Sequence, residues 1–305
     1  MTRKTSLRTL TLLAPALLLG CADQPKNRCK VAPGVGIARY KPKGTPTGDC
    51  SKVAMPMHGE PVGMNAFVPN PNLSQAPDTP TSLAIKPGWL GDRISEARDK
   101  ASLDPALAGM KDALLNYPYG ADPAPKPTDL KTTRRPYAFG QFKTVFPDDQ
   151  GVCEAGDLNE SDLTYPAIPP HQYPDPDDPM KAVMVGEQPE TAVKYAWHDV
   201  RTIQIASSPG TQTFGDLTIT RDGCTATFGV AILVPQVGCG VEKDGQQVAN
   251  QKLCDPNPNE ESLFGSGISQ GVPTKCEDIS VDPANPGAND PANPNFVCVP
   301  TKTKP

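Results

Sequence analysis

Proline is the residue that most limits how this chain folds, since 37 of its 305 residues are prolines. Proline lacks a backbone N–H and clashes with the preceding helical turn, so prolines about eight residues apart leave no room for long helices. The sequence therefore excludes a large helical bundle. A hydrophobic content of 37 % leaves few core-forming residues, which favours a loop-rich fold whose unfolded state is already restricted.

The charge balance bears on the class of partner. The formal net charge is −5 at pH 7, and no basic stripe runs along the chain. A protein that binds nucleic acid displaces phosphate counterions with clustered lysines and arginines. We therefore expect no nucleic-acid partner.

The first twenty residues are typical of an export signal. Arg3, Lys4 and Arg8 precede an apolar segment from Leu10 to Leu19 that is too short to span a bilayer stably. We expect this segment to be cleaved.

The segment ends in Leu18-Leu19-Gly20-Cys21, which resembles the lipobox of bacterial lipoproteins. The resemblance implies that the Cys21 thiol receives a diacylglycerol thioether, that cleavage occurs before Cys21, and that the new amine is acylated. Several acyl chains anchor a protein stably, so the expected partner is a lipid membrane. Ala22 departs from the Asp that retains enterobacterial members at the inner membrane, which favours the outer membrane. The periplasmic or surface face stays open, and an ordinary secretory signal with an incidental cysteine is the alternative.

Eight cysteines remain after Cys21. They are Cys29, Cys50, Cys153, Cys224, Cys239, Cys254, Cys276 and Cys298. An even number in an oxidising compartment indicates four disulfides, and the absence of any C-x-x-C argues against zinc ribbons, haem attachment and thioredoxin-like chemistry. Spacing does not fix the connectivity, although loops of about twenty residues favour Cys29 with Cys50 and Cys254 with Cys276.

Composition divides the chain into four expected segments. These are a signal peptide (1–20), a tether and first crosslinked loop (21–50), a mainly-β domain (51–240) with a helical insertion near 92–117, and a loop-rich, disulfide-linked C-terminal segment (241–305). Residues 165–179 hold many prolines and aspartates and predict an extended spacer.

The clearest structural signal lies between residues 191 and 237. Val193, Tyr195 and Trp197 alternate, and Val200, Ile203 and Ile205 then resume the pattern, as expected for a half-buried strand that is interrupted near His198. A turn is expected at residues 209–210, and Asp-Gly at 222–223 predicts a hairpin between two apolar runs. We therefore expect an antiparallel β-sandwich or barrel-like domain with a short helical insertion and long disulfide-crosslinked loops.

One cluster has metal-ligand chemistry. Met55, Met57, His58 and Met64 fall within ten residues, and thioether with imidazole suits Cu(I). Methionine at such spacing also fills cores, which is the commoner role.

Catalytic patterns are weak. Residues 267–271 match G-x-S-x-G around Ser269, but no histidine follows it, as the α/β-hydrolase order requires. His198 and Asp199 are neighbours on a strand, so their side chains point to opposite faces and form no dyad by themselves. We expect no catalytic residue and no cofactor.

The leading hypothesis is a membrane-anchored envelope lipoprotein with a non-enzymatic binding or structural role, whose partner is a protein or a glycan. A lipoprotein hydrolase acting on glycan or peptide, with carboxylates that converge only in the fold, is the first alternative. A copper-handling protein that uses the methionine cluster is the second.

Overall fold

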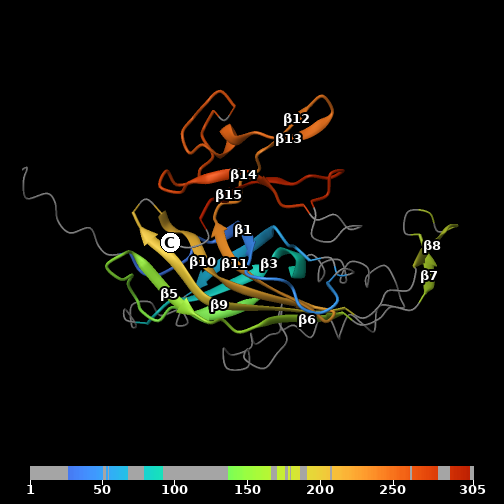
Figure 1. Ribbon diagram of the computed structural model, residues 1–305, viewed down its shortest axis with the longest axis horizontal. Helices are drawn as coiled ribbons and strands as arrows, with labels where there is room; N and C mark the ends of the chain where they lie inside the picture. The colour runs from blue at the N-terminus through green and yellow to red at the C-terminus, as the bar shows by residue number, and fades with distance from the viewer. Residues whose placement is uncertain are drawn as a thin grey trace, which may run out of the picture.

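The computed structural model describes residues 27–302 except 51–52, 54, 68–78, 92–136, 166–169, 176–177, 179, 186–190, 207, 262 and 281–288. The strands of the larger unit are β1 (Gly34–Pro42), β2 (Gly59–Phe67), β3 (Ser82–Pro87), β4 (Ala138–Gln141), β5 (Val152–Gly156), β6 (Ser161–Tyr165), β9 (Thr191–Ile205), β10 (Ser208–Arg221) and β11 (Cys224–Leu233). Two further strands, β7 (His171–Pro174) and β8 (Ala182–Val185), form a separate two-stranded sheet. A smaller C-terminal unit follows, with β12 (Gly240–Lys243), β13 (Gln246–Ala249), the 3₁₀ helix η5 (Gln251–Cys254), β14 (Thr274–Asp278) and β15 (Phe296–Pro300) (Figure 1).

The larger unit is an antiparallel sheet that almost closes on itself. Its strand order is β4-β3-β2-β1-β11-β10-β9-β5, with β6 also paired to β9. The two edges meet through backbone hydrogen bonds from Lys143 N to Glu154 O and from Asn159 N to Phe139 O, both 2.8 Å. Joining the edges satisfies backbone groups that an open sheet leaves unpaired. The prediction of a mainly-β, antiparallel, barrel-like domain is confirmed.

The inner face of the barrel-like sheet carries the apolar residues of each strand. On β11, Phe228, Val230 and Ile232 are buried in the barrel core, while Thr225 and Thr227 lie on the other face. The hydroxyls of these two threonines hydrogen-bond to threonines of β10. Period-two alternation of this kind fixes the register, because a slip of one residue would turn the apolar side chains to solvent.

The turn between β10 and β11 has the expected form. Asp222 and Gly223 both have positive φ, 48° and 82°, between the paired residues Arg221 and Cys224. These angles match the two-residue turn that suits the twist of a hairpin.

Strand β9 shifts its inward phase at a bulge. Its partner residues pass from His198 opposite Asp216 to Arg201 opposite Phe214, so β9 holds one extra residue there. Asp199 takes up the irregularity with a φ of 50°. The interruption predicted near His198 thus has its cause in this bulge. Beyond it Thr202 and Gln204 are buried, whereas Ile205 is exposed, so Ile203 and Ile205 do not continue the inward face as expected.

Two expected loops are corrected. The turn predicted at Pro209 and Gly210 lies earlier, because Ile205 already pairs with Ser208 and residues 209–210 belong to β10. The extended spacer of 165–179 instead contains part of a hairpin, in which β7 pairs with β8. Proline is tolerated in a two-stranded sheet, because both strands are edge strands and only one side of each forms backbone hydrogen bonds.

The expected tether of residues 21–50 is corrected in its second half. Strand β1 lies in the middle of the sheet, between β2 and β11, and buries Ala38 and Tyr40 in the barrel core. Gly36 is needed there, because a Cβ would lie 2.7 Å from Leu233 O and 2.8 Å from a methyl of Val234. The high glycine, proline and lysine content of this segment concealed a central strand.

Four disulfides join the eight cysteines that follow Cys21. The pairs are Cys29–Cys153, Cys50–Cys224, Cys239–Cys276 and Cys254–Cys298. The first two crosslink the larger unit over sequence separations of 124 and 174 residues, and the other two lie in the C-terminal unit.

The favoured short loops, Cys29 with Cys50 and Cys254 with Cys276, are wrong. A backbone bridge three residues before Cys50 is made to Thr225, the neighbour of Cys224. Sheet register, which joins distant segments, therefore decides the partner, and proximity in sequence does not.

The C-terminal unit packs on the outer face of β1 and β11 (Figure 1). Ile37 and Leu233 point out of the barrel-like sheet and are fully buried in the core of this unit, with the cysteines and Val297. Around Ile37 and Leu233 the two strands are therefore buried on both faces.

The helical insertion expected near residues 92–117 lies outside the described residues, as does Cys21. None of the helices in the described part of the chain has the length and apolar character that a bilayer crossing requires.

Replacing Gly223 by valine is expected to destabilise the protein by about 1–3 kcal/mol, because a β-branched residue is strained at positive φ. Urea unfolding of the full chain measures the change. Gly238→Val is the matched control, since Gly238 is exposed and a Cβ there meets nothing within 4 Å. Equal losses in both variants would contradict the turn assignment.

Removing the Cys50–Cys224 crosslink by a double alanine substitution is expected to lower the free energy of unfolding by about 3–5 kcal/mol, because this disulfide closes a very long loop of the unfolded chain. The midpoint of urea unfolding under non-reducing conditions reports the loss. An unchanged midpoint would mean that this pair is not formed.

Candidate functional site

A groove of 660 Å³ runs between the barrel-like sheet and the C-terminal unit. Its lining comes from β1, from the residue before β2, from β14 and from the segment after β15. The lining residues are Arg39, Tyr40, Lys41, Pro42, His58, Glu277, Thr301 and Lys302.

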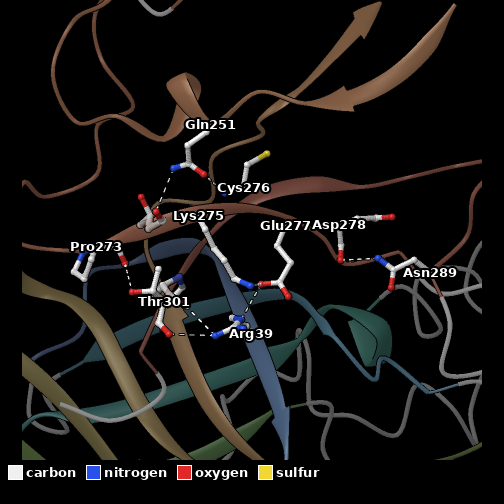
Figure 2. A network of polar contacts seen from close by, with 11 residues as sticks. Arg39, Gln251, Pro273, Lys275, Cys276, Glu277, Asp278, Asn289 and Thr301 are labelled. Carbon is white, nitrogen blue, oxygen red and sulfur yellow. Dashed lines mark hydrogen bonds and ion pairs between the residues drawn. The ribbon is translucent and has the colours of Figure 1, made fainter.

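Arg39 links the two walls of the groove. Its Nε donates to Glu277 Oε2 at 2.9 Å, and its Nη1 lies 3.5 Å from Pro300 O and 3.4 Å from Thr301 O. Figure 2 shows the Arg39 guanidinium reaching from β1 to these acceptors, with Lys275 approaching the same carboxylate. The Lys275 Nζ is 2.8 Å from Glu277 Oε2. Arg39 is therefore held in one orientation by contacts from the C-terminal unit.

The C-terminal wall is fixed by hydrogen bonds around β14. The side chain of Gln251 donates to Thr274 O at 3.2 Å and accepts from Cys276 N at 2.7 Å. At the other end of the strand, Asn289 donates to Asp278 O at 2.8 Å (Figure 2). These contacts hold β14, and with it Glu277, in place over β1.

The carboxyl of Asp278 is itself held by donors. Partial burial raises its pKa, but hydrogen bonds from Ser280, Asn295 and Asn289 outweigh burial and bring the pKa below its usual value. Asp278 is therefore an ionised anchor for the chain on either side of β14.

The groove carries a positive charge in an acidic protein. Arg39, Lys41 and Lys302 face one carboxylate, Glu277, whereas the whole chain has a net charge of −5. Within the described part of the chain, neither Lys41 nor Lys302 forms an ion pair, whereas Lys43, two residues along from Lys41, pairs with Asp216.

A buried polar cluster lies inside the barrel, behind the groove. Glu60 is 4 % exposed and accepts from Tyr40 Oη at 2.7 Å and from Trp89 N at 2.8 Å. Burial, and then the negative charge of Glu60, raise the pKa values of Tyr40 and Tyr195 well above the usual value. Both phenols therefore stay protonated and able to donate.

The structure separates the methionine cluster by burial. Met55 and Met64 are 2 % and 4 % exposed in the barrel core, and Met57 packs against that core. His58, in contrast, lines the groove. The two buried methionines therefore act as core residues, and His58 belongs to the groove.

His198 and Asp199 lie at the bulge of β9, and Asp157 joins them. Asp157 Oδ1 accepts from Asp199 N at 3.3 Å and lies 3.3 Å from His198 Nδ1. These two contacts lower the pKa of the Asp157 carboxyl, the one from Asp199 N most strongly. The contact to Asp199 is made by its backbone, so His198 and Asp199 do not form a side-chain dyad.

Ser269 lies in an irregular loop of the C-terminal unit, with its carbonyl accepting from Val272 N at 3.0 Å. No strand precedes it and no helix follows it among the neighbouring described residues. The G-x-S-x-G match therefore lacks the strand–turn–helix context of a nucleophile elbow.

In the part of the chain that the structure describes, one group of His, Cys, Asp or Glu has its ligand atoms within 4.8 Å of one another, namely Cys239, Cys254 and Cys298. All three sulfurs are engaged in disulfides. Because they are oxidised, these cysteines crosslink the C-terminal unit.

Sequence reasoning missed Arg39, Lys41, Glu277 and Lys302. The two ends of the groove are more than 230 positions apart in the sequence, so no local motif joins them. The one available signal was the pair of cations at alternate positions of 39 and 41, which an extended strand places on one face.

A family model described as MlpA matches residues 36–235. The match begins in β1 and ends just after β11, so it spans the larger unit and stops before the C-terminal unit. No curated protein and no solved structure matches the chain significantly.

Tyr40→Phe is expected to lower the free energy of unfolding at pH 7 by about 1–3 kcal/mol, because Glu60 loses a buried donor. The pKa of Tyr40 is raised in the native state, so its contribution to the free energy of unfolding is fully present below about pH 10. Above that pH the contribution falls, because the unfolded state releases a proton that the native state retains. Urea unfolding from pH 7 to 11 should therefore show a shallower alkaline decline in the variant.

Tyr173→Phe is the control for this experiment. Tyr173 lies on the hairpin of β7 and β8, and its substitution should change stability by less than about 0.5 kcal/mol. Matching pH curves for wild type and Tyr40→Phe would contradict the proposed role of the buried cluster.

Proposed function

The chain belongs to the MlpA family, and we propose that it is a lipid-anchored envelope protein that acts by binding. Membership of this family is compatible with an envelope lipoprotein. The anchor is Cys21, in the sequence Leu18-Leu19-Gly20-Cys21 that resembles a lipobox. Acylation with two or three chains holds a protein stably on a membrane.

The single observation that supports a binding role is the groove between the two units. Its walls are fixed by the contacts of Arg39 and Glu277, so the site exists before any ligand arrives. A preformed site loses little conformational entropy on binding. Two lysines without ion pairs among the described residues, Lys41 and Lys302, point to recognition of a charged partner.

The proposed location is the outer membrane. Ala22 follows the acylated cysteine, where Asp would retain enterobacterial lipoproteins at the inner membrane. The crosslinked domain then lies beside the envelope with the groove available to a glycan or a protein.

Palmitate labelling tests the anchor. The wild-type protein is expected to incorporate labelled palmitate and to partition into the detergent phase, whereas Cys21→Ser should do neither. Ala22→Ser keeps the cysteine and serves as the matched control. Equal labelling of wild type and Cys21→Ser would refute the anchor.

Membrane fractionation of an enterobacterial strain tests the location with the same proteins. Wild type should sediment with the outer membrane and Ala22→Asp with the inner membrane. Recovery of both in the inner membrane would remove the outer-membrane assignment and leave the anchor intact.

A further inference from the structure

The orientation of Arg39 leaves one side of its guanidinium open to the groove. Its Nε and Nη1 are directed to Glu277, Pro300 and Thr301, and its Nη2 has no hydrogen bond to any of the described residues. An arginine already held in place keeps its remaining donors ordered for an oxyanion, because less side-chain freedom is lost on binding.

The one carboxylate that lines the groove, Glu277, does not prevent an anion from binding there. Glu277 is shared by Arg39 and Lys275, at 2.9 and 2.8 Å, so two cations surround its negative charge. Lys41 and Lys302 then remain as cations whose charge is not matched among the described residues. The groove therefore attracts negative charge although the chain as a whole is acidic.

The size and lining of the groove indicate the kind of molecule to which the anionic group belongs. Its volume of 660 Å³ is in the range of about 300–1,000 Å³ found for sites that hold organic ligands, and it is far larger than a bare oxyanion needs. Most of the lining side chains are polar or charged, with Pro42 the only aliphatic one. A polar body such as a sugar fits this lining better than an apolar one.

We infer that the groove binds the phosphate group of a phosphorylated saccharide, with Arg39, Lys41 and Lys302 on the phosphate oxygens. This inference rests on the proposed binding role and names its ligand class. A phosphate monoester carries more charge and more acceptor oxygens than a carboxylate, and it matches three cationic side chains.

The test uses the detergent-solubilised full chain and isothermal titration with glucose 1-phosphate, glucose and inorganic phosphate. Wild type should bind glucose 1-phosphate more tightly than inorganic phosphate, and glucose least. The double variant Lys41→Gln/Lys302→Gln should weaken binding of glucose 1-phosphate by about tenfold. Raised salt should weaken wild-type binding too.

The matched control is Lys30→Gln/Lys243→Gln. Both lysines are exposed and lie outside the groove, so the control has the same net charge as the test variant. It should keep wild-type affinity. Equal weakening in the two double variants would overturn the inference, because it would show a general effect of net charge.

Two further outcomes also overturn it. Inorganic phosphate binding as tightly as glucose 1-phosphate would assign the site to free phosphate. No binding of either probe by wild type at millimolar concentration would remove the phosphate site. Neither result affects palmitate labelling of Cys21, so the experiments test the anchor and the ligand class independently.

Discussion

The burial of Ile37 and Leu233 beneath the C-terminal unit is the packing on which the rest of the structure depends. These side chains leave the outer face of β1 and β11 and enter a second core, while their neighbours on the same strands fill the barrel. Burying both faces of two adjacent strands fixes the position of β14 and β15 over the sheet. The Arg39–Glu277 ion pair alone would not do so, since partly exposed ion pairs contribute little.

The sequence predicts the parts of the fold that depend on local physics. Alternation along residues 191–237 and the Asp222–Gly223 turn identify the β9–β11 meander, because side-chain period and turn geometry are properties of a few neighbouring residues. Strand β1 was missed for the opposite reason. Its Gly36 is needed for close packing against β11 and the residue after it, and that contact lies about 200 positions away.

The same distinction applies to the candidate site. His58 was noticed for copper chemistry and lies in the groove for a different reason, as the residue before β2. Arg39 and Lys302 acquire their roles only when the C-terminal unit docks on β1. Disulfide partners follow the same rule, since sheet register brings Cys50 to Cys224 across 174 residues. Contacts between segments that are distant in the sequence therefore cannot be predicted from local sequence patterns.

The place of Cys29 has a mechanical consequence. Tension applied to the N-terminal end of the chain reaches Cys29 before it reaches β1, and the disulfide to Cys153 carries the load directly into β5. The next crosslink, Cys50–Cys224, lies on the far side of β1, so this strand is enclosed between two covalent bonds. Pulling therefore loads the closing edge of the barrel together with the backbone that leads to β1, so the central strand does not carry the whole load.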